Sequence, residues 1–149
     1  MSELSIKLKI VTPEGNSFEN FADQVTLLTT DGQITILPNH RSYIASLKPG
    51  ELIFKKGGEA TYLYVSGGFI EFNNNELIVL ADAAERAEEI DLKNAEEARR
   101  RAEELKKQKT FIDDEEYAAV AAAIQKETAR IRVARKHHTR RGMSLGGEQ

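Results

Sequence analysis

The chain has 149 residues, of which 40% are hydrophobic, and this is enough apolar material for one modest core but not for two large ones. It contains no cysteine, which excludes a disulfide framework and a thiolate metal site. The formal net charge of -3 conceals an asymmetry, because residues 1–82 carry 6 basic and 10 acidic side chains whereas residues 126–141 carry 7 basic and 1 acidic. The far end of the chain is therefore locally cationic.

The first half of the chain is predicted to be β-structure. In residues 4–11 apolar and polar side chains alternate, which is the period-two pattern of a half-buried strand. Turn-forming segments such as Asp31-Gly32 and Gly67-Gly68 divide the sequence that follows. Further strands are expected at 24–30, 33–37, 43–47, 52–56, 61–65, 69–72 and 77–81. Short strands at near-regular spacing, with no helix between them, predict an antiparallel β-sandwich.

The second half is predicted to form two helices, because glycine is absent from Ala83 until Gly142 and alanine and charged residues dominate. Asp91 is expected to cap the first helix, and Asp113 with Glu116 resembles a capping box at the start of the second. The small face of the first helix comprises Ala95, Ala98, Ala102 and Leu105. The apolar stripe of the second comprises Tyr117, Val120, Ile124, Thr128, Ile131 and Ala134. A short loop between two such helices predicts an antiparallel hairpin, whose alanine-rich seam buries little area.

The motifs provide no constellation for catalysis or metal binding. His137 and His138 are adjacent, so on a helix they point to different sides and cannot form a metal clamp. Ser66-Gly67-Gly68 lacks the Gly-Lys-Ser/Thr of a phosphate-binding loop and is predicted to be a turn. The arginines at 99–101 are flanked by glutamates on both sides in the sequence, which predicts a solvated, salt-bridged helix surface. The cationic segment from Lys126 onward is the candidate for contact with an acidic partner.

The start of the chain lacks the apolar run of a signal peptide, and no stretch approaches the roughly 18 apolar residues of a membrane span. We therefore expect any association with a membrane to go through another protein.

Four segments, in this order, carry a resemblance to a known family. They are "ILPNH" at 36–40, "LKPGEL" at 47–52, "SGGF" at 66–69 and "VLADAAERAEEID" at 79–91. With "TPEGNSFE" near the start and the alanine-rich hairpin, they resemble the epsilon subunit of the bacterial F-type rotary ATP synthase over residues 4–136. Two departures are visible, because Thr35 stands where a glycine commonly precedes "ILP" and residues 139–149 extend past the usual end.

The resemblance implies a β-sandwich rotor-binding domain at 1–84, a helical hairpin regulatory domain at 85–138 and a flexible tail at 139–149. It implies that the sandwich binds the gamma subunit and the c-ring, and that the hairpin can extend toward the catalytic alpha and beta subunits and inhibit ATP hydrolysis. Such a chain is a non-catalytic central-stalk subunit that couples proton-driven rotation to ATP synthesis. The complex would hold it at the cytoplasmic face of the bacterial plasma membrane.

The expected subunit contacts are His40, in the loop at 38–41, and Arg130, Arg132 and Arg135. For His40, hydrogen bonding within its own loop is the alternative role. Exposed charges on the basic helix are the alternative for the arginines.

Some members of the family bind ATP on the folded hairpin through an Ile-Asp-x-x-Arg-Ala motif and further basic residues. Here Ile90, Asp91 and Ala95 match the motif, but Asn94 takes the arginine position. The family's other contacts correspond to Glu85, Arg101, Lys126 and Arg130. Because asparagine can neither neutralise a phosphate nor make a charged fork, the resemblance implies a weakened site for ATP as a regulatory ligand and no required cofactor.

The alternative interpretation is a free-standing β-sandwich adaptor whose basic helix binds nucleic acid or an acidic protein. Nucleic-acid binding is disfavoured, because the whole chain is acidic and the basic segment has no aromatic residue that could stack on bases.

Overall fold

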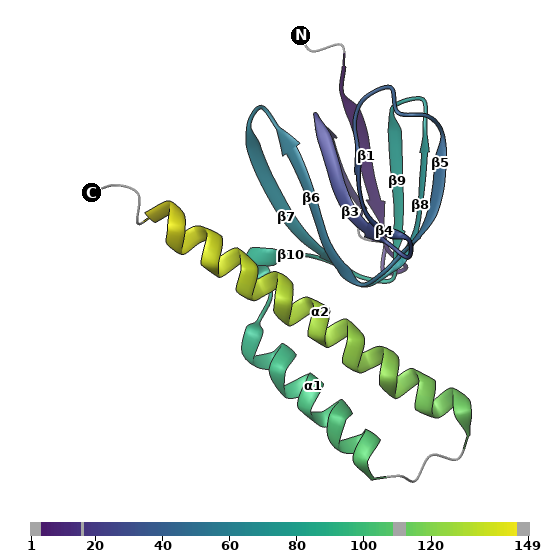
Figure 1. The fold of residues 1–149 in the computed structure, drawn as a ribbon, viewed down its shortest axis with the longest axis vertical. Helices are drawn as coiled ribbons and strands as arrows, with labels where there is room; N and C mark the ends of the chain where they lie inside the picture. The colour runs from purple at the N-terminus through teal and green to yellow at the C-terminus, as the bar shows by residue number, and fades with distance from the viewer. Residues whose placement is uncertain (1–3, 16, 109–112, 146–149) are drawn as a thin grey trace. The chain divides into compact units, whose positions relative to one another are not determined.

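The computed structural model describes residues 4–15, 17–108 and 113–145, and the chain divides into two compact units, Met1–Arg86 and Ala87–Gln149. The first unit contains the strands β1 (Ile6–Val11), β2 (Ser17–Ala22), β3 (Gln24–Thr29), β4 (Gly32–Ile36), β5 (Tyr43–Leu47), β6 (Gly50–Lys56), β7 (Glu59–Val65), β8 (Gly68–Asn73), β9 (Glu76–Ala81) and β10 (Ala84–Arg86) (Figure 1). The second contains a 3-10 turn, η1 (Ala87–Glu89), and the helices α1 (Leu92–Lys107) and α2 (Asp114–Leu145).

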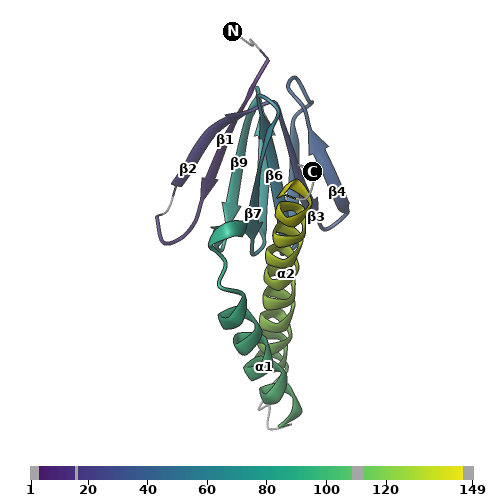
Figure 2. The ribbon, with the colours of Figure 1, turned by 90° about the vertical axis from the view of Figure 1, so that its left-hand side faces the viewer.

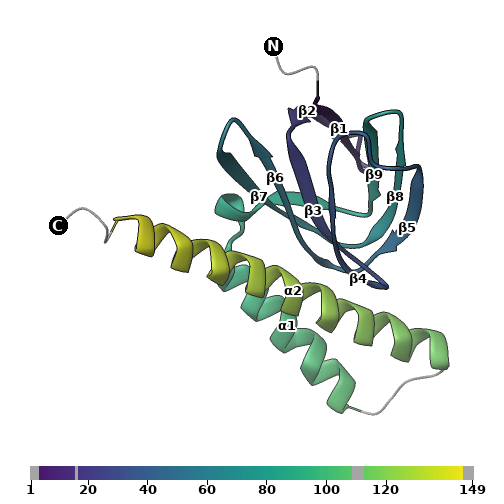
Figure 3. The same ribbon diagram turned by 45° about the horizontal axis from the view of Figure 1, so that its top comes forward.

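In the described part of the first unit, the ten strands form one sheet in the order β10-β7-β6-β3-β5-β8-β9-β1-β2, with β4 added beside β3. The sheet curls so that its distant strands approach one another (Figure 3). The rings of Phe18 of β2 and Phe54 of β6 pack at a tilt of 51° with their centroids 5.5 Å apart, and the Arg86 guanidinium of β10 lies 5.7 Å from the centroid of the Phe18 ring. These contacts join β2, at one end of the strand order, to β6 and to β10 at the other end, and they confirm a sandwich-like all-β unit.

Each predicted strand is present, but the sequence analysis missed β2 and β10. In β2 the two phenylalanines, Phe18 and Phe21, stand three residues apart and therefore face opposite sides, which breaks the period-two pattern. Among the strands of the described residues, the antiparallel prediction holds for every pairing except one. β1 and β9 are parallel, with Leu8 opposite Leu77 and Ile10 opposite Val79.

The core of the first unit lies inside the curl of the sheet. Alternate residues of β1 point inward, and Ile6, Leu8 and Ile10 are no more than 2% exposed. Every member of this core cluster lies between Ile6 and Ala84. Burying each large apolar side chain contributes about 1.5–3 kcal/mol, so the first unit has the material for a core of its own.

Both predicted helix caps are present in the second unit. Asp91 Oδ1 accepts a hydrogen bond from the Asn94 N–H over 3.1 Å, and Asp113 Oδ1 accepts one from the Glu116 N–H over 2.8 Å. The two helices run side by side in opposite directions (Figure 2), which confirms the hairpin. The hairpin was predicted to end at His138, but α2 continues to Leu145. Thr139 Oγ1 donates to the Arg135 carbonyl oxygen within this helix, and a single Gly142 costs an exposed helix only about 1 kcal/mol.

The seam of the hairpin is most deeply buried at the end away from the loop, and Ala102, nearer the loop, is 9% exposed. Ala95 and Ala134 are fully buried and Ile131 is 2% exposed, whereas the predicted seam residues Leu105 and Tyr117, near the loop, are 54% and 46% exposed. Leu105 and Tyr117 are therefore not part of the buried seam. At the Tyr117 ring, the ammonium of Lys106 lies 5.7 Å from the ring centroid.

Candidate functional site

The loop that carries His40 runs between β4 and β5 and is tied to the β8–β9 turn by side-chain amides. The Asn39 N–H donates to Asn75 Oδ1 over 2.5 Å, and Asn75 Nδ2 donates back to Asn39 Oδ1 over 3.0 Å. Ser42 Oγ donates to Asn73 Oδ1 over 2.9 Å. Asn39 and Asn75 have φ values of 65° and 60°, a left-handed conformation that asparagine tolerates better than most residues. Loop and turn therefore form one hydrogen-bonded corner around a groove of about 300 Å³.

His40 contributes to the structure of this corner while staying exposed. Its Nδ1 lies 2.7 Å from the Arg41 carbonyl oxygen. The ring also packs edge-on against Tyr43 and Phe72, with centroids 6.1 and 5.8 Å away. The structure thus contains the loop hydrogen bond that was the alternative role for His40, and its contact with a partner stays a prediction.

The outward face of β1, β5, β8 and β9 carries apolar side chains at positions where a solvated sheet carries polar ones. We call the following residues the outer apolar patch: Val11, Ile44, Phe69, Ile78 and Leu80. Ile44, Phe69 and Leu80 are 74%, 60% and 53% exposed. In register, Leu80 stands between Phe69 of β8 and Val11 of β1, so these three side chains are contiguous across strands. Ile44 stands opposite Glu71 and is a diagonal neighbour of Phe69. Sequence analysis missed it, although the unbroken apolar run "LIVLA" in β9 was a signal that both faces of that strand are apolar.

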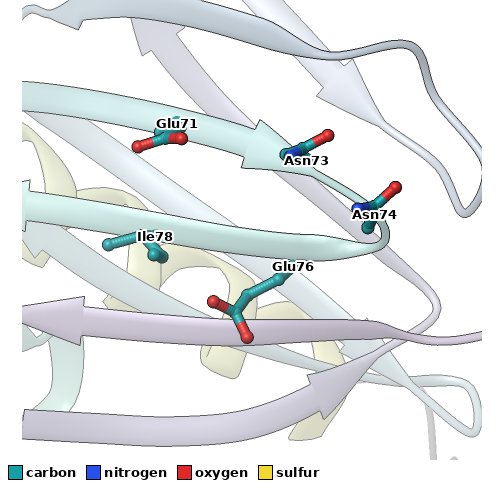
Figure 4. A pocket seen from close by; sticks show the side chains of 5 residues that line it. All are labelled: Glu71, Asn73, Asn74, Glu76 and Ile78. Carbon is teal, nitrogen blue, oxygen red and sulfur yellow. The ribbon is translucent and has the colours of Figure 1, made fainter.

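A polar rim borders one end of the outer apolar patch. Figure 4 shows Glu71 on β8 beside Ile78 on β9, with Glu76 at the start of β9 and Asn73 and Asn74 where the chain turns. These side chains line a groove of about 280 Å³. An apolar centre with a polar rim is the composition of a protein–protein interface. We do not assign a ligand to this groove, because two glutamates beside asparagine side chains are a common arrangement on protein surfaces.

The residues that the resemblance relates to ATP are divided between the two units. Glu85 belongs to β10 in the first unit, and the others lie in the second. Asp91 is used as the cap of α1, Ile90 is 7% exposed, and Ala95 is fully buried, so these three have structural roles in the hairpin.

The basic members of this set are accessible to different degrees. Arg101 is exposed on α1, whereas Lys126 and Arg130 are half-buried one turn apart on α2. Arg130 Nη1 lies 3.6 Å from Glu127 Oε2 of the same helix. ATP binding by these residues stays a prediction.

The arginines predicted to contact a partner differ in their surroundings. Arg135 Nη2 donates to Glu96 Oε1 over 2.7 Å, and this charged hydrogen bond joins α2 to α1. Arg130 pairs within α2, as described above. Arg132 is exposed and makes no ion pair with any residue in the described ranges. The closed hairpin therefore already uses Arg135, which sequence reasoning could not foresee.

The motifs considered for metal or phosphate have structural explanations. The rings of His137 and His138 have their centroids 6.4 Å apart on one helix, and the described residues contain no group of three or more His, Cys, Asp or Glu placed to hold a metal ion. Ser66 and Gly67 connect β7 to β8, whose first residue is Gly68, and Ser66 Oγ accepts a hydrogen bond from the Ala83 N–H over 2.7 Å. In the part of the chain that is described, no helix is both long and apolar enough to cross a membrane.

Comparison with known families identifies the origin of this architecture. The family described as "ATP synthase, Delta/Epsilon chain, beta-sandwich domain" matches residues 5–87. The ATP synthase epsilon chain of Clostridium novyi is 47% identical over 111 residues, which cover 73% of this chain and 84% of the relative. That of Chloroflexus aggregans is 39% identical over 141 residues, covering 95% of this chain and 100% of the relative.

Two solved structures share the fold at lower sequence identity. A chain of the Euglena gracilis mitochondrial ATP synthase superposes with a TM-score of 0.70 and 22% identity, covering 84% of this chain and 78% of its own length. A chain of the Tetrahymena thermophila mitochondrial ATP synthase, from its central stalk and c-ring, gives a TM-score of 0.52 and 16% identity, covering 89% and 95%. With its matched β-sandwich domain and relatives that span nearly its whole length, the chain belongs to the ATP synthase epsilon chain family, whose members are non-catalytic subunits of that complex.

Proposed function

We propose that this chain is a central-stalk subunit whose β-sandwich docks on the gamma subunit and the c-ring and whose helical hairpin limits ATP hydrolysis. The observation that carries the proposal is the division into two compact units, one with an exposed apolar face and one with a cationic helix. In this arrangement the subunit couples proton-driven rotation to ATP synthesis without performing bond chemistry. The complex holds it at the cytoplasmic face of the bacterial plasma membrane, and ATP acts at most as a regulatory ligand, weakened by Asn94.

The outer apolar patch is the surface that we assign to the gamma subunit. Three large side chains, Ile44, Phe69 and Leu80, are more than half exposed, and their burial in an interface contributes up to about 1.5–3 kcal/mol each. The hydrogen-bonded corner around His40 lies at the end of the sheet where β8 turns into β9, and it presents polar groups that suit a second, polar contact such as the c-ring. The family relationship supports these two partners.

The docking surface is tested with a charge placed in its centre. Phe69→Asp should abolish co-purification with the cognate gamma subunit while the far-ultraviolet circular dichroism stays unchanged, because Phe69 is outside the core. The control is Gln33→Asp, which introduces the same charge at an exposed position of β4, off the patch. If Phe69→Asp binds gamma as well as Gln33→Asp does, the outer apolar patch is not the docking surface.

The regulatory role of the hairpin is tested by removing it. A chain that ends at Ile90 keeps the whole core cluster of the first unit, so it should fold and still support coupled ATP synthesis. Hydrolysis by the reconstituted complex should rise, because nothing then reaches the catalytic subunits. Unchanged hydrolysis with normal incorporation of the truncated chain would show that the hairpin does not inhibit.

A further inference from the structure

A cationic groove runs between the two helices of the second unit, on a face that the expected ATP residues do not use. It has a volume of about 430 Å³. Its lining, which we call the groove residues, is Arg99 of α1 and Thr128, Ile131, Arg132, Arg135, Lys136 and Thr139 of α2. The positions on α2 recur every three or four residues, so they form one stripe along the helix.

Positive charge predominates in this groove. Four of the groove residues are cationic and none is acidic. Two of the groove arginines, Arg99 and Arg135, contact carboxylates that do not line the groove, since Glu96 Oε1 accepts from Arg135 Nη2 over 2.7 Å and Glu103 Oε1 lies 3.9 Å from Arg99 Nε. The Glu103 contact is long, and the Arg99 and Arg135 side chains are 31% and 58% exposed, so both guanidinium groups are accessible. Arg132 has no ion pair within the described ranges.

We propose that this groove binds an oligophosphate, that is, an anion with two or more linked phosphate groups. Guanidinium groups recognise phosphate oxygens with paired hydrogen bonds, and here they come from both helices. The volume is within the range of small-molecule sites, yet Ile131 is the one apolar side chain among the groove residues. The charged groups that line the groove therefore favour recognition of phosphate groups. The hydroxyl of Thr128 adds a neutral donor, whereas that of Thr139 already donates to the Arg135 carbonyl oxygen.

Binding in this groove would stabilise the folded hairpin. An anion held by Arg99 of α1 and by Arg132 of α2 links the two helices, and a ligand that binds only the folded form shifts the equilibrium toward it. This regulatory consequence rests on the proposed function, whereas binding itself does not. None of the residues that the resemblance relates to ATP lines the groove.

The test is calorimetric titration of the full-length chain, without other subunits, with pyrophosphate at low and at high salt. We expect saturable binding to one site that weakens as salt rises. The double variant Arg99→Gln/Arg132→Gln should lower the affinity by about tenfold or more, because hydrogen bonds to charged groups are the strong ones. The matched control is Arg100→Gln/Arg141→Gln, which removes the same charge from exposed positions of the same two helices outside the groove.

The controls give every outcome a meaning. Glutamine keeps helix propensity, and circular dichroism of both variants verifies that the hairpin still forms. Equal loss of affinity in both double variants, or no saturable binding of pyrophosphate to the wild type, would overturn the proposal. Tripolyphosphate and ATP should bind with similar affinity, since both present three linked phosphates. If ATP binds and neither pyrophosphate nor tripolyphosphate does, the recognised group is the nucleoside and the oligophosphate site is refuted. Because hydrolysis is not measured, this test can fail while the proposed function stands, and the reverse also holds.

Discussion

The contact between Glu96 and Arg135 gives a sharp test of the movable hairpin, because it exists only when the helices are folded together. Glu96→Gln removes the charge of this pair but preserves helix propensity and size. The closed hairpin is thereby weakened, while any contact of Arg135 with an acidic partner in the extended state is kept. The expected result is a larger extended population and therefore less ATP hydrolysis, not more.

The magnitude follows from the exposure of the pair. The Arg135 and Glu96 side chains are 58% and 37% exposed, so solvent screening places the pair in the range of surface ion pairs, about 0.2–1 kcal/mol. That energy changes the ratio of extended to folded hairpin by about 1.4- to 5-fold. The effect should shrink as ionic strength rises, because screening weakens the pair in the wild type and has little to act on in the variant.

The assay is ATP hydrolysis by the reconstituted complex at two ionic strengths, with Glu104→Gln as the control. Glu104 lies on the same helix, is exposed, and makes no side-chain ion pair with the residues that the structure describes. Arg135→Ala should have a smaller effect than Glu96→Gln, since it removes a contact from both states. If complexes with Glu96→Gln and Glu104→Gln hydrolyse ATP equally at low salt, or if the complex with Glu96→Gln hydrolyses it faster than the wild type, the Glu96–Arg135 pair does not hold the hairpin closed.

Three further changes have expected directions, and the first of them rests on the proposed function. Arg132→Ala removes a cation that has no ion pair in the described part of the folded hairpin, so in the absence of pyrophosphate it should relieve inhibition, and equal hydrolysis with wild type would contradict this. Gly68→Ala should destabilise the first unit by at least about 1–3 kcal/mol in denaturant unfolding, because φ is +128° and the new Cβ would run into the Leu80 carbonyl oxygen. Gly15→Ala is its control, with a left-handed φ of +80° but nothing within 4 Å of the new Cβ. Asn75→Ala should lower the thermal unfolding midpoint by removing two hydrogen bonds worth about 0.5–1.5 kcal/mol each. An unchanged midpoint would show that the hydrogen bonds between the His40 loop and the β8–β9 turn do not stabilise the first unit.

The sequence by itself determined the elements whose signals are local. Alternation over residues 4–11 predicted a strand, because the pleat gives every strand a period of two. Gly67 and Gly68, both with positive φ, marked the break between two strands. Asp91 and Asp113 predicted where the helices begin, since an N-cap needs only a side-chain oxygen and the next turn of backbone. The family motifs led to the family and to its fold class.

The tertiary structure alone decided which distant residues meet. The parallel pairing of β1 with β9 and the clamp between Asn39 and Asn75 join segments far apart in the sequence, and no local pattern encodes such pairings. The outer apolar patch was hidden for a related reason, because a strand that is apolar on both faces does not show which face is covered. Glu96 and Arg135 form a contact only through the register of the hairpin, and a shift of α2 by one residue would turn the arginine away by about 100°. Local periodicity follows from backbone geometry, whereas register follows from how the packed side chains fit together.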